Sequence, residues 1–130
     1  MVKKNEKSSS IESVKKLPGK AYTKNIRARF WITGPDGSYI GIGRIELLEH
    51  IIEEGSISKA AKRMAMSYKK AWKLIEELNK LYDEPLVVKE QGGKQGGGTH
   101  VTVRGLLMIE KYRQLESELS EFLQSKSSEF

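Results

Sequence analysis

The sequence predicts an α+β fold that is mainly helical, and three features of the chain lead to this prediction. Apolar residues recur at helical spacing in four stretches, two pairs of β-rich runs stand apart from these stretches, and turn residues separate the segments. The resulting order is strand-strand-helix-helix-helix-strand-strand-helix. A short helix, a tight turn and a longer helix, followed by a hairpin, are typical of a winged helix-turn-helix.

A single domain usually has about 100–150 residues, so we expect the 130 residues to form one domain with a segment on either side of it. Residues 1–24 hold seven Lys and two Glu around Pro18-Gly19, a composition typical of a basic disordered arm. Residues 25–104 form the winged helix-turn-helix domain with its opening β-hairpin. Residues 105–130 form a long C-terminal dimerisation helix and a tail.

The domain opens with an alternating stretch, residues 25–33, which predicts a strand with one buried face. Residues 34–37 (Gly-Pro-Asp-Gly) predict a turn, and residues 38–43 predict the returning strand. The next helix covers residues 44–54 and stops at Gly55. The apolar face of that helix is expected to comprise Ile45, Leu48, Ile51 and Ile52.

Two further helices form the predicted helix-turn-helix. Residues 58–64 predict a short helix with Ser58 as its N-cap, and residues 67–82 predict a longer helix with Ser67 as its N-cap. The apolar side of the longer helix comprises Ala71, Leu74, Ile75, Leu78 and Tyr82. Lys69, Lys73 and Lys80 lie opposite this apolar side and Lys70 lies on one flank, so one face of the helix is apolar and the other is basic.

Positive charge is concentrated on the predicted helix-turn-helix and wing. Residues 56–80 hold seven basic and two acidic residues, a net charge of +5, and residues 89–104 carry +2. Residues 25–55, 81–88 and 105–130 each carry −2. Lysines opposite an apolar stripe usually form a solvated face, but this segregation favours a surface that neutralises DNA phosphates and releases their counterions.

The expected DNA contacts follow from how helices meet DNA. The first turns of a recognition helix reach base edges in the major groove, and hydroxyls and N–H groups at helix N-termini hold phosphates. Trp72 flanks the apolar stripe as a packing residue, whereas packing and base contact remain evenly balanced for Tyr68. The expected DNA-contacting residues are Ser56, Ser58, Lys59, Ser67, Tyr68, Lys69, Lys70, Lys73, Lys94, Gln95, Thr99 and His100.

The stretch GGKQGGGTH, residues 92–100, could be a phosphate loop of an enzyme, a linker or the tip of a hairpin. The glycine spacing matches neither a P-loop nor a dinucleotide-binding loop, and the stretch leads into a β-rich run and not into a helix. Short β-rich runs at residues 86–89 and 99–103 flank it, which favours a wing tip over a linker. Thr102 can then cap a last helix that runs to about Gln124.

The last helix predicts a symmetric homodimer. Its apolar residues are spaced four, three, four and three apart, which is the seam of a coiled coil. The alternative is that this stripe packs on the core of its own domain, as we expect of its N-terminal half. The expected interface comprises Trp31, Met108, Tyr112, Leu115, Leu119, Phe122 and Leu123.

Several functions find no support in the sequence. Without cysteine the chain can form neither disulfides nor thiolate metal sites. His50 and His100 show no metal-ligand or catalytic spacing, so we expect no metal, no cofactor and no enzymatic activity. No apolar stretch approaches the about 20 residues of a membrane span and no signal peptide is present, so we expect a cytoplasmic, nucleoid-associated protein without membrane contact.

The segments GSISKAAKRMAMSYKKAWKLIEELNKL and EPLVVKEQGGKQGGGTHVTVRG carry a combined pattern that is specific where each motif alone would not be. Over roughly residues 25–124 the chain resembles the DNA-binding domain of ModE-type molybdate-responsive transcriptional regulators and, more distantly, LysR-type regulators. The resemblance implies a winged-helix dimer acting on DNA. By position it places the start of the recognition helix at Ser67-Tyr68-Lys69-Lys70 and the wing at residues 92–100.

The resemblance also implies that molybdate is sensed by additional C-terminal domains with a small β-barrel fold. The sequence ends shortly after its last predicted helix and leaves no residues for such a sensor. We therefore expect no molybdate binding by this chain alone, and isothermal titration with molybdate or tungstate tests this expectation: a one-site isotherm at micromolar concentration would contradict it.

The sequence thus predicts a sequence-specific DNA-binding transcriptional regulator that acts as a homodimer on an inverted repeat of double-stranded DNA. Two alternatives remain open: a winged-helix module for protein–protein interaction, and a non-specific architectural DNA-binding protein. The three differ in their affinity for specific and random duplex.

Overall fold

The computed structural model describes residues 17–90 and 98–130. Two compact units divide the chain: one is Phe30–Glu118, and the other joins the N-terminal segment up to Arg29 with Leu119–Phe130. Residues 1–16 of the expected arm and residues 91–97 of the glycine-rich stretch lie outside the described ranges. The expected division at residues 24 and 104 remains a prediction.

The larger unit opens with a short hairpin, as expected. Strand β3 (Ile32–Thr33) pairs antiparallel with β4 (Tyr39–Ile40). The N–H of Gly34 donates to the carbonyl oxygen of Ser38 over 2.7 Å, which closes the predicted turn. Gly37 within this turn has a φ of +81°, a conformation that glycine adopts without steric cost.

The expected strand over residues 25–33 is wrong in its extent. Arg27–Ala28 form β2, which pairs with β1 (Lys20–Ala21) and not with the returning strand. Strand β1 lies within the expected arm, whose residues 1–16 are outside the described ranges. The Arg27 guanidinium donates to the carbonyl oxygen of Gly19 over 2.7 Å, so backbone pairing and a side-chain hydrogen bond together hold this turn.

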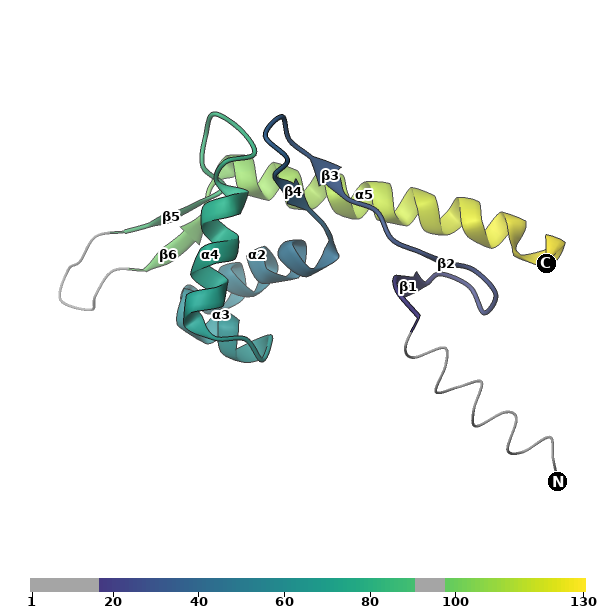
Figure 1. Cartoon of the computed structure of the whole chain (residues 1–130), viewed down its shortest axis with the longest axis horizontal. Coiled ribbons are helices and arrows are strands. Elements are labelled where there is room, and N and C mark those ends of the chain that lie inside the picture. Colours follow the sequence, from purple (N-terminus) through teal and green to yellow (C-terminus); the bar gives the residue numbers. More distant parts are fainter. Residues whose placement is uncertain (1–16, 91–97) are drawn as a thin grey trace, which may run out of the picture. The chain divides into compact units, whose positions relative to one another are not determined.

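Helices α2 (Ile42–Glu54), α3 (Ile57–Arg63) and α4 (Tyr68–Leu78) pack in sequence order within the larger unit (Figure 1). Gly55 ends α2 in the left-handed conformation, with its N–H donated to the carbonyl oxygen of Ile51. The predicted Ser58 N-cap is wrong. Ser56 caps α3, because its Oγ accepts from the Lys59 N–H over 3.2 Å.

The predicted Ser67 cap of α4 is confirmed, with Oγ accepting from the Lys70 N–H over 3.0 Å. The predicted end near residue 82 is wrong, because α4 ends at Leu78. Asn79 explains the early end. Its Oδ1 accepts the backbone N–H groups of Leu86 and Val87, and its Nδ2 donates to the carbonyl oxygen of Val87. Asn79 thereby ties the end of α4 to the following strand.

One hydrophobic core lies under these helices. The expected face of α2 is wrong at one position, since Ile52 is 48% exposed whereas Leu47, which was not expected to face inward, is fully buried. The apolar stripe of α4 is confirmed: Ala71, Ile75 and Leu78 are buried, and Leu74 and Tyr82 pack against the core. The largest fully buried side chains are Ile40, Ile45, Leu47, Leu48, Ile51, Ile75, Leu78 and Leu86.

The wing pairs β5 (Val87–Lys89) with β6 (Thr99–Val101) in antiparallel register. Helix α5 (Val103–Lys126) follows at once. The predicted role of Thr102 is confirmed: its Oγ1 accepts from the Gly105 N–H over 3.2 Å and donates to the carbonyl oxygen of Pro85 over 2.7 Å. The residue that caps α5 therefore also fixes the segment that leads into the wing.

An ion-pair cluster docks α5 on α2. Arg113 donates to both carboxylate oxygens of Glu49 at 3.0 and 2.7 Å and to Glu116 at 2.8 Å. The hydrogen bonds to Glu49 raise the pKa of Arg113 above its ordinary value, so the guanidinium remains charged. Phe30 stacks on Tyr112 with ring centroids 4.6 Å apart, which adds an apolar contact to this face of α5.

The smaller unit contains the β1–β2 hairpin, the C-terminal turns of α5 and a 3₁₀ turn, η1 (Ser127–Glu129). Asn25 connects these segments. Its Nδ2 donates to the carbonyl oxygen of Ser127 over 3.0 Å, and its Oδ1 accepts from the Ser127 hydroxyl over 2.6 Å. Hydrogen bonds across 102 positions of sequence thus join the N-terminal hairpin to the end of the chain.

Candidate nucleic-acid interface

Helix α4 presents the basic face that the sequence predicts. Lys69, Lys70 and Lys73 are exposed, while Ala71 and Ile75 on the other side of the helix are buried. Within residues 17–90 and 98–130 these three lysines form no ion pair, so their charge is available to a ligand at the surface. The Ser67 cap fixes the first turn, which orients the lysines with respect to the core.

Helix α3 and its N-cap contain three of the expected DNA-contacting residues, which differ in exposure. Ser58 and Lys59 are exposed, whereas Ser56 is half-buried and its hydroxyl is engaged as the N-cap. Arg63 at the end of α3 forms ion pairs with Glu54 at 3.2 Å and with Glu53 at 3.5 Å. The charge of Arg63 is thereby locally balanced, so Lys59 and Lys62 are the cations that α3 adds to the three lysines of α4.

An aromatic pair connects α4 to the wing. The indole N–H of Trp72 donates to the Tyr68 hydroxyl over 2.6 Å, and their rings meet edge to face. Trp72 packs against the core, as expected, while Tyr68 is 46% exposed. Because the Tyr68 oxygen accepts from Trp72, its own O–H is free to point elsewhere. Lys89 of β5 lies 5.6 Å from the Trp72 ring centroid, a cation–π contact that the sequence did not reveal.

The wing residues divide into three groups. Lys94 and Gln95 lie outside the described residues. Thr99 was expected to face DNA, but the structure buries it to 7% exposure, and its N–H donates to the carbonyl oxygen of Gly55 over 3.2 Å. Thr99 therefore anchors the wing to the turn after α2. His100 is exposed, with Nδ1 3.2 Å from Glu90 Oε1.

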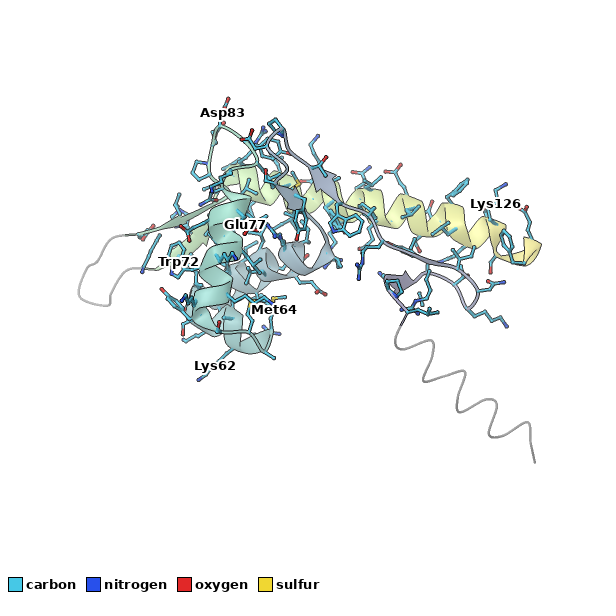
Figure 2. The ribbon with its side chains drawn as sticks, viewed as in Figure 1. Lys62, Met64, Trp72, Glu77, Asp83 and Lys126 are labelled. Atoms are coloured by element: carbon cyan, nitrogen blue, oxygen red, sulfur yellow. The ribbon has the colours of Figure 1, made fainter. Side chains whose placement is uncertain are left out.

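The opposite flank of α4 contains contacts that sequence reasoning missed. Arg44 of α2 is 7% exposed; its Nη2 donates to Glu77 of α4 over 2.7 Å, and its guanidinium lies 4.1 Å from the Tyr39 ring centroid. Figure 2 labels Trp72 and Glu77 on different sides of α4. No sequence pattern signals this cluster, because Glu77 lies 33 positions after Arg44 and meets it only in the folded domain.

The expected dimer residues also differ in exposure. Met108 and Tyr112 are buried in the core of the larger unit at 7% and 2% exposure, so they pack on their own domain, as expected of the N-terminal half of the helix. Trp31 and Leu115 are 49% and 44% exposed in that unit. In the smaller unit, Phe122 is 58% exposed, and Leu119 and Leu123 are partly exposed.

Among the described residues, no group of three or more His, Cys, Asp or Glu side chains could hold a metal ion. Within the same part of the chain, no helix has the length and apolar character needed to cross a membrane.

Comparison with known proteins identifies relatives of this chain. The chain is 47% identical over 91 residues to the molybdenum transport protein ModE of Azotobacter vinelandii, an alignment that covers 70% of this chain and 34% of that protein. It is 38% identical over 93 residues to the transcriptional regulator ModE of Haemophilus influenzae, covering 72% of this chain and 36% of that protein. The chain thus spans about a third of the length of these curated relatives.

A third relative is the DNA-binding transcriptional dual regulator ModE of Escherichia coli, 48% identical over 69 residues, which cover 53% of this chain and 26% of that protein. Residues 42–106 match the family model of the bacterial regulatory helix-turn-helix proteins of the lysR family. That range holds α2, α3, α4 and the wing, which are the elements described above. The chain therefore belongs to the lysR family of bacterial regulatory helix-turn-helix proteins and contains a DNA-binding domain of the ModE type.

Proposed function

We propose that this chain is a sequence-specific DNA-binding regulator of transcription, with α4 in the major groove and the wing on the phosphate backbone. The exposed lysines of α4 are the observation that carries this proposal, because they stand on a capped helix whose other face is fixed in the core. Lys59 and Ser58 extend this surface along α3, and Tyr68 directs a hydroxyl from the first turn of α4.

Binding-site selection tests the proposal. A random duplex library should converge on one sequence, and affinity for that sequence should exceed affinity for random duplex by at least about 10³-fold at physiological salt. An architectural protein would bind both duplexes about equally, and a protein-docking module would bind neither. Lys94 and Gln95 in the wing tip are expected to contact phosphates, which carry no sequence information.

We further propose that the regulator acts as a homodimer. The smaller unit has an apolar groove of about 350 Å³ between the β1–β2 turn and the end of the chain. Phe122, at 58% exposure, and Phe130, at 84%, lie beside it, and exposed apolar patches of this kind usually mark an interface. In the larger unit, Leu115 and Trp31 are exposed members of the expected interface. The groove is lined by Asn25, Ile26, Phe122, Leu123, Lys126 and Phe130.

A two-fold dimer has a consequence for the DNA site. It would place two recognition helices about 34 Å apart and prefer an inverted repeat with half-sites centred about 10 bp apart. Replacing Leu119 and Phe122 by Glu should yield monomers that lose most of their affinity for the selected site, since two charges would be buried in an apolar contact. Sedimentation of the wild type should give about twice the 14.7 kDa chain mass at micromolar concentration.

The matched control is Glu118→Gln, which changes a neighbouring exposed position of α5 without adding charge to the apolar residues. It should remain dimeric and bind the selected site as the wild type does. A wild-type chain that sediments as a monomer, alone and on DNA, would exclude the dimer while leaving the DNA-binding proposal intact.

A further inference from the structure

A groove of about 530 Å³ runs along the flank of α4 that faces away from the wing. Helix α4 contributes Lys70, Lys73 and Glu77 to it, while Tyr39 comes from β4 and Arg44 from α2. The other flank of α4 carries Trp72, against which Lys89 of the wing lies. Figure 1 shows the same arrangement, with α4 between the β5–β6 pair on one side and the β3–β4 pair on the other.

The floor of this groove is a buried cation. Arg44 donates to Glu77 through Nη2, and the pair neutralises the single acidic side chain of the groove. The Tyr39 ring covers the guanidinium at 4.1 Å. Nη1 of Arg44 is also buried, and no described residue accepts a hydrogen bond from it. The guanidinium therefore adds positive charge beneath the exposed lysines of the groove, while the ligand-accessible donors are those of the lysines and Tyr39.

The groove carries an excess of positive charge. Lys69, Lys70 and Lys73 also line it, so four cations face one carboxylate and leave a net charge of +3. The lysines are exposed and Tyr39 is 40% exposed, so ligand oxygens can reach their polar atoms. An anion with several acceptor oxygens matches this set of donors.

The position of the groove specifies which anion. An α-helix with its side chains is about 10–12 Å across, close to the about 12 Å width of the major groove. A helix inserted there has a sugar-phosphate backbone along each flank. If the wing meets one backbone, the groove beside Tyr39 faces the other.

We propose that this groove binds a backbone phosphate of DNA on the strand opposite the one that the wing contacts. In this site Lys70 supplies charge and the Tyr39 hydroxyl donates a hydrogen bond. Arg44 holds the Tyr39 ring through their cation–π contact and adds a second positive charge to the groove. The inference rests on the proposed function, and it extends the DNA-binding surface to the β3–β4 hairpin, which lies outside the helix-turn-helix and the wing. Two clamped backbones would fix the depth and rotation of α4 in the major groove.

Neutral phosphate substitution tests the site. The probe is the duplex selected from the random library, with one phosphate at a time replaced by an uncharged methylphosphonate. For the wild type, substitutions on both strands should weaken binding about threefold to tenfold each. In Tyr39→Phe and in Lys70→Ala, one phosphate on the strand away from the wing should lose its effect, because its protein partner is already missing.

Two variants serve as controls for the fold and for charge. Tyr82→Phe removes a hydroxyl from a ring that packs under Arg104, and Lys111→Ala removes a charge from an exposed position of α5. Both should show the wild-type pattern at every phosphate. Lys70→Ala should also flatten the salt dependence of binding by about one unit, whereas Tyr39→Phe should leave the slope unchanged.

The outcomes separate the two proposals. One outcome is that wild-type protein selects and binds a site while every phosphate substitution weakens the binding of Tyr39→Phe and Lys70→Ala as much as that of the wild type. In that case the groove is not a phosphate site and the proposed function stands. If wild-type protein binds no duplex at all, the proposed function fails and the groove assignment fails with it.

Discussion

Replacing Lys69 and Lys73 by Glu should reduce affinity for the selected site by roughly a hundredfold or more at physiological salt. Both side chains are exposed on α4, and each replacement substitutes repulsion of phosphate for attraction. A hundredfold change corresponds to about 2.7 kcal/mol, which two reversed charges near a polyanion readily supply. The salt dependence should flatten as well, because fewer counterions would be released.

The fold should survive this double replacement. Neither lysine lies in the core or caps a helix, and the Ser67 cap and the buried face of α4 remain. Circular dichroism and thermal unfolding therefore check that the loss is one of binding. Lys111→Glu is the matched control for Lys73→Glu, since each changes the net charge by the same amount at an exposed helical position. Unchanged DNA affinity in the double variant would contradict the proposed interface.

The sequence was most informative where local chemistry decides structure. The turn at residues 34–37, the Ser67 cap and the Thr102 cap each depend on a few adjacent residues, and the structure contains all three. The apolar stripe of α4 was also predictable, because helical spacing alone defines it. The lysines follow from the same spacing, so the main basic face could be identified without coordinates.

Other features depend on partners distant in sequence. Ser56 and Ser58 are equally good caps in isolation, and the choice between them depends on where Gly55 ends α2. The end of α4 depends on Asn79, whose side chain pairs with the strand that starts at Val87. Local periodicity contains no information about either contact.

The candidate site shows the same division. Arg44, Glu77 and Tyr39 come from three elements, and the sequence around each of them predicts only an exposed helical position or a hairpin strand. Thr99 alternates with His100 in a β-rich run, and the sequence does not reveal which of them faces inward. The structure answers this through the hydrogen bond from Thr99 to Gly55, which requires the folded turn after α2.

Gly105 illustrates a tertiary constraint with a large expected effect. It lies in the first turn of α5, where an added methyl group would stand 2.5 Å from the carbonyl oxygen of Leu86 and would overlap the Val101 side chain. The oxygen of Leu86 cannot easily move away, because it accepts from the backbone N–H of Thr102 over 2.9 Å. Leu86 is itself fully buried, so a shift would disturb the core.

Gly105→Ala should therefore lower the free energy of unfolding by about 3 kcal/mol, at the upper end of overpacking costs and a large fraction of the about 5–15 kcal/mol that stabilises a domain. Gly43→Ala is the matched control, because its added methyl group meets no described atom within 4 Å and α2 should gain about 0.5–1 kcal/mol from the helix propensity of alanine. Urea unfolding measures both changes. Equal midpoints for Gly105→Ala and the wild type would show that α5 does not lie this close to Leu86, since a close approach of helix and strand is the only reason that position requires glycine.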